Sequence, residues 1–349
     1  MKYLLIILFY ALSSIAFSQE VSFSNFPKNT NCVLLIAEKG KIVFNQAFGL
    51  RNSVDSMDIN TSFHLASISK PITAIAVFLL QKKGLFDLND SIKKFLPDFP
   101  HPNITLKQML NHTSGLGYRN EKDWDYLYST IKDRALNNND YYEYYLKANK
   151  KLLFTPGTKF SYSNDAYDFL AMIVEKVSGE KFTDFIQNNI FIPLKMNNLF
   201  GFETAKSINY KNFASSFEYS KGKIKIDVDS IGAYNDIIGS NNICSSAQDL
   251  FLLDKALYSE ILFSEETIQN IFSNTISKNK ETNFGLGWFI DRVNPYKVSH
   301  TGEYLKYSNI FVRYLNSQNT VIFLSNSGDL NKFYGSIFKL EKFFAKNNE

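Results

Sequence analysis

The sequence predicts an α/β protein of the α+β type, in which strands from the two ends of the chain form one antiparallel sheet flanked by helices, with a mainly helical subdomain inserted between them. Two observations lead to this fold class. Short β-prone runs lie near both ends of the 349-residue chain, whereas helical periodicity dominates the middle. Strands separated in this way can bury an apolar face together only if they meet in one sheet. We expect the sheet part to comprise about residues 30–84 and 284–349, and the helical insertion about residues 85–283.

The expected strands are rich in Val, Leu, Ile and Phe. Cys32–Ala37 and Lys41–Gln46 are joined by Glu38-Lys39-Gly40, where glycine can adopt the positive φ of a tight turn, so we expect a hairpin. The C-terminal strands are separated by Asn, Pro, Gly and Ser; they are Gly285–Asp291, Tyr296–His300, Tyr307–Tyr314 and Thr320–Ser325. An amphipathic helix over Lys332–Lys346 is expected to close the chain.

Three further helices are predicted from apolar residues at helical spacing. The first runs from about Ser67 to Lys83, with Pro71 in its first turn, where proline is tolerated, and Gly84 as its stop. The second is Asp165–Ser178, and the third is Ser246–Tyr258.

The N-terminus has the pattern of an export signal, which we expect to comprise residues 1–18. Met1-Lys2 is a short basic start, Tyr3–Phe17 is an apolar run, and Ala16-Phe17-Ser18 places small residues before a cleavage site. The run is shorter than the ~20 residues of a membrane-spanning helix; a buried N-terminal helix is the alternative. We therefore expect an exported protein, periplasmic or secreted, whose mature chain, residues 19–349, has no membrane span.

Composition narrows the possible partners. The net charge of +4 is small and dispersed, so we expect no nucleic acid. The four histidines do not share metal-ligand spacing, so we expect no metal site. The two cysteines, Cys32 and Cys244, either form a disulfide or are two buried small apolar residues, because separation in sequence says nothing about proximity.

The main candidate for chemistry is Ser67-Ile68-Ser69-Lys70. A serine hydroxyl becomes a good nucleophile only when a base removes its proton. Residues three apart on a helix share a face, so Lys70 can reach the Ser67 oxygen, and desolvation by the apolar helix would lower the lysine pKa towards neutrality. The spacing alone is weak evidence, because four other Ser-x-x-Lys copies begin at Ser91, Ser178, Ser220 and Ser277. Ser67 differs from them in opening an apolar helix, and enzymes that use this motif carry two companion motifs further along the chain.

Both companions occur in the expected order. Tyr162-Ser163-Asn164 precedes the helix at Asp165; a phenol near Lys70 could pass a proton to a leaving group, whereas the alternative is a helix cap with Asn164 as the N-cap. His300-Thr301-Gly302 ends a predicted strand, where backbone N–H groups can hold an acyl group and glycine permits close approach. The alternative for this second motif is an ordinary strand end.

Taken together, these motifs resemble the serine β-lactamase-like superfamily in its class C branch, which includes class C β-lactamases, DD-carboxypeptidases, D-aminopeptidases and related esterases. The matching segments follow the family order from about Cys32 to the C-terminal helix. They are Phe63–Ala74, Leu110–Leu116, Pro193–Met196, Ser245–Leu250 and Gly285–Trp288.

The resemblance implies a reaction and a set of residues. Ser67 would be acylated, while Lys70 and Tyr162 would share the general-base and general-acid work. The N–H groups of Ser67 and Glu303 would form the oxyanion hole. The residues implied to bind substrate or the oxyanion are Asn164, His300, Thr301, Gly302 and Glu303. No cofactor is implied, and we expect a monomer that acts on a small-molecule or peptide substrate, either an ester, an amide or a D-amino-acid peptide.

Two departures from the family pattern concern the substrate. His300 stands where the best-known members have lysine, and a mostly neutral histidine is less suited to a substrate carboxylate. Glu303-Tyr304 follow where many relatives have glycine, and a carboxylate there would disfavour an anionic ligand. A weakly catalytic or non-catalytic sensor of cell-wall fragments is the alternative function, and a structural envelope protein is a third.

Overall fold

The structure is a computed structural model of the chain. It describes residues 30–132, 134–197, 200–201, 212–220, 223–226, 236–277 and 280–328, together with Gly335. The expected signal peptide, residues 1–18, lies outside these ranges, as does all of the expected C-terminal helix except Gly335. Within the described residues, no helix has both the length and the apolar content needed to cross a bilayer.

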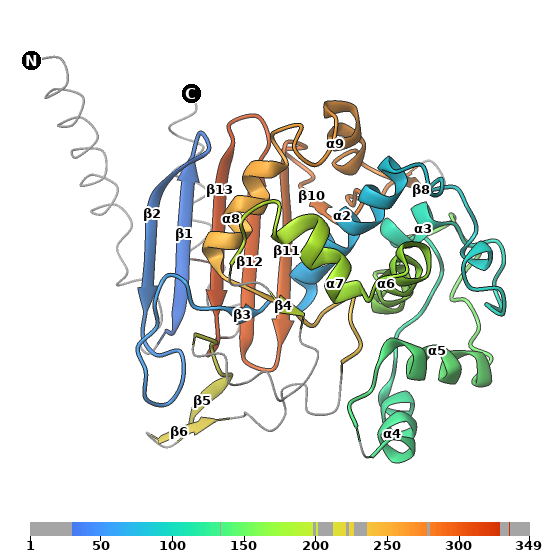
Figure 1. Cartoon of the computed structure of the whole chain (residues 1–349), viewed down its shortest axis with the longest axis horizontal. Helices are drawn as coiled ribbons and strands as arrows, with labels where there is room; N and C mark the ends of the chain where they lie inside the picture. The colour runs from blue at the N-terminus through green and yellow to red at the C-terminus, as the bar shows by residue number, and fades with distance from the viewer. Residues whose placement is uncertain are drawn as a thin grey trace, which may run out of the picture.

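A six-stranded antiparallel sheet forms one side of the molecule (Figure 1), and its strand order is β10-β11-β12-β13-β1-β2. Its strands are β1 (Cys32–Glu38), β2 (Lys41–Phe48), β10 (Phe289–Ile290), β11 (Lys297–Tyr304), β12 (Tyr307–Tyr314) and β13 (Asn319–Ser325). The two ends of the chain meet in the β1–β13 pair, in which Cys32 lies opposite Ser325. The expected sheet of N- and C-terminal strands is therefore confirmed.

The β1–β2 hairpin forms as predicted, although its turn is shorter than expected. Glu38 is still part of β1 and pairs with Lys41. The turn consists of Lys39 at φ +51° and Gly40 at φ +70°. Two consecutive positive φ values match the right-handed twist of the strands, which favours this two-residue connection.

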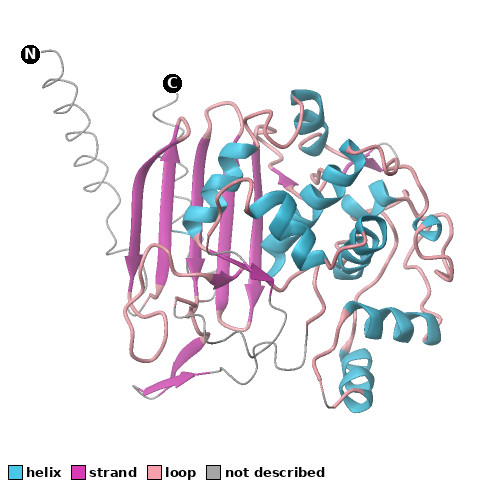
Figure 2. Ribbon diagram, viewed as in Figure 1, coloured by secondary structure: helices cyan, strands magenta, loops and turns pink. Residues whose placement is uncertain are grey.

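Helices fill the other side of the molecule (Figure 2). They are α2 (Ser69–Lys82), α3 (Leu106–Leu110), α4 (Glu121–Thr130), α5 (Asn138–Lys147), α6 (Asn164–Ser178), α7 (Phe182–Ile186), α8 (Ala247–Ala256) and α9 (Glu265–Ile271), with short turns η2 (Ala66–Ile68), η3 (Ile92–Lys94) and η4 (Gln187–Phe191). The three predicted helices correspond to α2, α6 and α8. One prediction was wrong in detail, because Ser67 lies in the 3-10 turn η2 before α2 and not in the α-helix.

The middle of the chain is less purely helical than expected. A three-stranded sheet joins β3 (Phe63–His64), β7 (Ile243–Ser245) and β4 (Phe200–Gly201). Two hairpins pair β5 (Phe217–Ser220) with β6 (Lys223–Ile226), and β8 (Ile276–Ser277) with β9 (Lys280–Glu281). These strands have only two to four residues each, too few to show the alternation by which a strand is predicted. In the β3–β7 pair, His64, which lies shortly before Ser67, is opposite Cys244.

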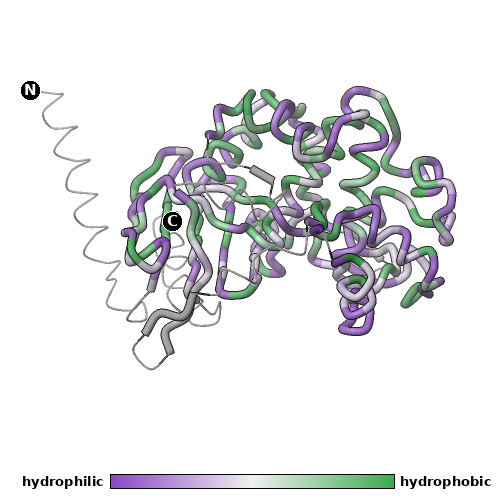
Figure 3. The backbone as a smooth tube through the Cα atoms, turned by 60° about the horizontal axis from the view of Figure 1, so that its bottom comes forward, coloured by the Kyte–Doolittle hydropathy of each residue, from purple (hydrophilic) through white to green (hydrophobic). Residues whose placement is uncertain are grey.

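The strands β1, β12 and β13 are buried on both faces of the main sheet, whereas most of the edge strand β2 is exposed or half-buried. Successive side chains of a strand point to opposite faces. Val33 and Leu35 pack into the large core shared with α2 and α6. Leu34 and Ile36 pack into a second cluster on the opposite face. Burial on both faces requires a continuous apolar run, and β1 has one from Cys32 to Ala37. Figure 3 shows hydrophobic and hydrophilic residues interspersed along the chain. Cys32 and Cys244 are buried and free, so the alternative of two buried thiols holds and the disulfide does not form.

A buried ion pair fastens α8 to the sheet. Asp254 of α8 accepts a hydrogen bond from the Arg313 Nε at 2.5 Å and one from the Thr320 hydroxyl at 2.6 Å. Neither charged side chain is exposed to solvent. The helix α8 thus packs on β12 and β13. It was expected to belong to the helical insertion and instead covers the main sheet.

Candidate active site

Ser67 lies in the short turn η2, where the chain leaves β3 and enters α2. Ala66 has a φ of +50°, a left-handed conformation that residues with a side chain rarely adopt. The Ala66 N–H donates to the His64 Nδ1 at 3.1 Å, which helps to hold this conformation. The turn leaves Ser67 partly exposed, while its neighbours Ala66 and Ile68 are buried. A reactive hydroxyl is thereby presented on an otherwise buried segment.

The Lys70 side chain points back from α2 to the Ser67 hydroxyl. Its Nζ donates to the Ser67 Oγ at 3.0 Å and to the Ser240 carbonyl at 2.9 Å. Lys70 has no exposed surface. Burial lowers the pKa of Lys70 to about 7; the Asp168 carboxylate acts to raise this pKa and the Arg119 guanidinium acts to lower it. The amine can therefore exist without its proton near neutral pH, as a general base must.

Tyr162 lies on the other side of this pair. Its ring centroid is 4.8 Å from the Lys70 Nζ. Burial raises the pKa of the Tyr162 phenol, whereas its hydrogen bond with Ser67 acts to lower it. The His112 ring packs against the Tyr162 ring at a centroid distance of 4.3 Å and holds it in place. The structure thus brings Ser67, Lys70 and Tyr162 together from segments far apart in sequence.

Asn164 is the first residue of α6 and does not cap it. Ser163 is the N-cap, and its hydroxyl accepts the Ala166 N–H at 3.2 Å. The capping alternative proposed for Asn164 from the sequence was therefore wrong. The Asn164 Oδ1 is buried and has no hydrogen-bond partner among the described residues. An amide that is not used for capping is available to bind another group.

The strand β11 places the third motif inside the sheet and not at a strand end. The strand continues to Tyr304, and His300 through Glu303 pair with Phe311 back to Ser308 of β12. Gly302 passes so close to the nucleophile segment that a Cβ atom there would lie 2.1 Å from the Leu65 carbonyl oxygen and 3.2 Å from the Ser67 nitrogen. Only glycine permits this approach. Thr301 is partly exposed and Glu303 is exposed.

The His300 ring is buried next to Tyr162, at a centroid distance of 6.2 Å, with Phe289 on another side at 5.3 Å. Its Nδ1 lies 2.7 Å from the Thr301 carbonyl oxygen, which can only accept, so Nδ1 carries the hydrogen. Burial lowers the pKa of His300 to about 3, and the Lys70 charge acts in the same direction. The ring is therefore neutral, and its buried Nε2 has no partner among the described residues. That nitrogen can accept a hydrogen bond.

Sequence reasoning missed the role of His64, although this residue belongs to the matched segment Phe63–Ala74. His64 is fully buried, and burial lowers its pKa to about 4. Because its Nδ1 accepts the Ala66 N–H, its Nε2–H donates to the Asn242 Oδ1 at 2.8 Å. This neutral ring supports the turn that carries Ser67. No periodicity in the sequence distinguishes it from a core histidine.

Sequence reasoning also missed a charged cluster next to Lys70. Asp168, on α6, accepts the Ser240 N–H at 2.9 Å and a hydrogen bond from Arg119. Arg119 is also 3.5 Å from an Asp165 carboxylate oxygen. All three side chains are buried, at 5%, 1% and 1% exposure for Arg119, Asp165 and Asp168. Charged residues are usually exposed, and nothing in the sequence marks these three as buried. The cluster could therefore not be predicted.

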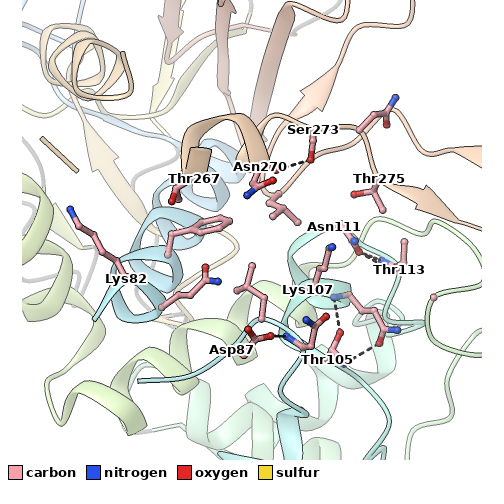
Figure 4. Close-up of a pocket in the computed structure, with 18 of the residues that line it drawn as sticks. Lys82, Asp87, Thr105, Lys107, Asn111, Thr113, Thr267, Asn270, Ser273 and Thr275 are labelled. Atoms are coloured by element: carbon pink, nitrogen blue, oxygen red, sulfur yellow. Dashed lines mark hydrogen bonds between the residues drawn. The ribbon is translucent and has the colours of Figure 1, made fainter. Parts of the chain in front are cut away.

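A separate cleft of about 890 Å³ lies at the other end of α2 from Ser67 (Figure 4). Its lining includes Gln81 and Lys82 from the last turns of α2, Lys107 of α3 and Asn270 of α9. Ser67, Lys70 and Tyr162 do not line it, so it is not part of the candidate site.

In the part of the chain that the structure describes, no three His, Cys, Asp or Glu side chains are grouped so that they could hold a metal ion.

Comparison with known proteins assigns one family to nearly the whole chain. The family profile described as Beta-lactamase matches residues 25–343. Penicillin-binding protein 4* of Bacillus subtilis (strain 168) is 31% identical over 326 residues, which cover 88% of this chain and 71% of that protein. Among solved structures, EstCE1, a hydrolase with promiscuous acyltransferase activity, superposes with a TM-score of 0.75 at 21% identity and covers 95% of this chain and 97% of its own. A D-stereospecific amidohydrolase from Streptomyces sp. superposes with a TM-score of 0.69 at 21% identity, over 87% and 92% of the two chains.

Proposed function

Since the chain belongs to the Beta-lactamase family, we propose that it is a serine hydrolase that cleaves esters, amides or D-amino-acid peptides through an acyl-enzyme on Ser67. One observation carries this proposal. The Ser67 hydroxyl lies 3.0 Å from the Nζ of a fully buried Lys70 whose pKa is lowered to about 7. A nucleophile within reach of a base that can lose its proton near physiological pH is the minimum that acyl transfer needs.

In the proposed reaction, the neutral Lys70 amine takes the Ser67 proton while the Ser67 Oγ forms a bond to the substrate carbonyl carbon. The tetrahedral intermediate then breaks its bond to the leaving oxygen or nitrogen. The leaving group receives the proton from Lys70 through the Tyr162 hydroxyl, whose raised pKa keeps it protonated. Water repeats the sequence on the acyl-enzyme, which releases a carboxylic acid and restores the Ser67 hydroxyl.

The Ser67 and Glu303 N–H groups are proposed to form the oxyanion hole, and the sheet register supports this role. Tyr304 and Tyr307 flank a two-residue turn and form the first hydrogen-bonded pair of the β11–β12 ladder. Bonded and non-bonded pairs alternate along an antiparallel ladder. Glu303, opposite Ser308, therefore directs its N–H away from β12 towards the open edge of the sheet. Removal of one such donor typically costs about 10²–10³ in rate.

The substrate is proposed to be uncharged where it meets His300. The neutral ring offers an acceptor at Nε2 and no positive charge, so it would pair with a substrate N–H or O–H and would not attract a carboxylate. Asn164, two residues after Tyr162, is proposed to offer a further amide, whose buried Oδ1 has no partner among the described residues. The exposed Glu303 carboxylate would repel anionic ligands. These features favour esters and amides over β-lactams and over stem peptides with a free carboxylate.

The proposal is tested by incubating the purified protein with a fluorophosphonate probe and, separately, with a fluorescent penicillin. Ser67→Ala is the matched control. We expect the phosphonate to label the wild type but not Ser67→Ala, and the penicillin to label poorly. Absence of both labels from the wild type would refute the proposed nucleophile. A protein that is acylated by esters but never releases the acyl group would be the alternative sensor.

Three further expectations belong with this proposal. Export with removal of residues 1–18 is supported by the apolar run Tyr3–Phe17, and N-terminal sequencing of the mature protein tests it. A single catalytic domain over residues 19–349, and a monomer, are tested by limited proteolysis and by light scattering.

A further inference from the structure

We propose that Asp168 is a positioning residue for Lys70: it holds the Ser240 carbonyl against the Lys70 Nζ and, together with Arg119, sets the electric field at that amine. The inference rests on the proposed function, because it concerns the lysine that would activate Ser67. It adds residues that lie outside all three catalytic motifs.

The geometry forms a short chain of contacts. The Asp168 Oδ1 accepts the Ser240 N–H at 2.9 Å, and the Ser240 carbonyl accepts a hydrogen bond from the Lys70 Nζ at 2.9 Å. Ser240 thus bonds Asp168 through its N–H and Lys70 through its carbonyl. The other acceptor for the lysine amine is the Ser67 hydroxyl. A shift of the Ser240 carbonyl would therefore reorient the Nζ relative to Ser67.

The segment around Ser240 is held on both sides. The Thr73 hydroxyl of α2 donates to the Gly239 carbonyl at 2.7 Å. On the α6 side, Gly239 has a φ of +126°, and a Cβ there would lie 2.4 Å from the Tyr167 carbonyl oxygen. Asn138 of α5 donates to the Ile238 carbonyl at 2.7 Å and accepts the Ile238 N–H at 2.8 Å. Within this clamp, Asp168 provides the acceptor for the Ser240 N–H.

Few charges act on Lys70, because most groups that face it are neutral. His112 and His300 have pKa values lowered by burial, and the Tyr162 and Tyr167 phenols have pKa values raised by burial. Among the residues that the structure describes, the charges that act on the Lys70 pKa are those of Asp168, which acts to raise it, and Arg119, which acts to lower it. Asp165 lies beyond Arg119, and burial raises its pKa to about 6.

Two aromatic rings pack against the Arg119 guanidinium next to this cluster. Its guanidinium carbon lies 4.4 Å from the Tyr141 ring centroid and 4.9 Å from the Trp124 ring centroid. The Tyr141 hydroxyl in turn donates to the Asp165 carboxylate at 2.5 Å. A cation fixed by aromatic faces keeps the Asp168 carboxylate in one orientation.

The test is the rate constant of fluorophosphonate labelling between pH 5 and pH 10 for the wild type, Asp168→Asn, Asp168→Ala and Arg119→Gln. The acid limb is the pH range in which the labelling rate falls because Lys70 becomes protonated. Loss of the negative charge lowers the Lys70 pKa, so both Asp168 variants should move this limb down by about one pH unit. Loss of the positive charge should move it up in Arg119→Gln. Asp168→Ala, which also frees the Ser240 N–H, should lower the plateau rate by about tenfold or more.

Asp165→Asn is the matched control, since Asp165 pairs with Arg119 from the same helix but does not contact Ser240. It should change the plateau rate by less than Asp168→Ala does. Simple damage to the fold would lower rates in all variants without moving their acid limbs in opposite directions. If Arg119→Gln does not fold, as judged by its melting transition, the two Asp168 variants still decide the matter.

An acid limb in Asp168→Asn and Asp168→Ala that coincides with the wild type, at an unchanged plateau, would overturn the inference and leave the proposed function intact. Failure of the wild type to be labelled at all would instead contradict the proposed function, and this inference with it.

Discussion

The Lys70 Nζ lies 3.0 Å from the Ser67 Oγ across the junction between a 3-10 turn and the α2 helix. The turn exposes the hydroxyl, and the helix buries the amine. This combination makes one group accessible to substrate while it desolvates the other.

Lys70→Ala and Tyr162→Phe should each reduce the rate of acylation by more than about 100-fold, the usual scale for a general acid or base. The first variant removes the base, and the second removes the hydroxyl that would carry the proton to the leaving group. Stopped-flow measurement with a chromogenic ester checks both. Acylation at the wild-type rate in either variant would remove that residue from the mechanism.

The acylation rate of the wild type should rise with pH and level off above about pH 7. Lys70 can accept the Ser67 proton only in its neutral form, and burial lowers its pKa to about 7. Below that value the rate should fall about tenfold for each pH unit, because the neutral fraction falls in that proportion. A pH series of single-turnover rates measures this limb. A limb near pH 10, where an unperturbed lysine titrates, would show that the amine is not desolvated.

His300→Lys should raise the acylation rate for carboxylate-bearing substrates relative to a neutral ester by about tenfold, the effect of one added charge pair of about 1.4 kcal/mol. The new ammonium would supply the positive charge that the neutral histidine lacks. The ratio of kcat/KM for the two substrates is the quantity to compare, with His300→Gln as a neutral control. If His300→Gln gives the same increase, a change of shape and not of charge is responsible.

Gly302→Ala should lower the acylation rate by at least about 100-fold while the protein still folds. The added methyl group would meet the Leu65 carbonyl oxygen at 2.1 Å, so β11 must move away from the Ser67 turn. A displacement of about 1 Å at a reacting centre costs about this much. Gly84→Ala serves as a control, because no atom lies within 4 Å of its Cβ position, although its φ of +71° carries a small strain. Equal losses in the two variants would argue against a special role for the Gly302 approach.

Local sequence features predicted much of the fold. The hairpin at Lys39-Gly40, the end of α6 at Ser178 and the strand β12 depend on turn chemistry and periodicity, which neighbouring residues determine. The pairing of the two chain ends followed from the need to bury a common apolar face. Short strands such as β7 and β10 were missed or misjudged, because two or three residues carry no periodic signal.

The Ser67–Lys70 contact could be predicted because the two residues lie within one short motif. Among contacts between distant segments, that of Tyr162 with Lys70 was expected from the companion motifs, but those of the surrounding charged residues were not. Asp168 meets Ser240 across 72 positions of sequence. Nothing in the spacing of these residues indicates that a carboxylate on one helix supports a carbonyl that contacts the lysine.

The most direct test of the account is to identify the residue that becomes acylated. The protein is trapped with a fluorophosphonate, digested, and examined by tandem mass spectrometry. We predict a single adduct on the peptide that contains Ser67, located on the Ser67 hydroxyl, and no adduct in Ser67→Ala. An adduct on another serine, such as Ser69 or Ser240, or full labelling of Ser67→Ala, would contradict the central claim.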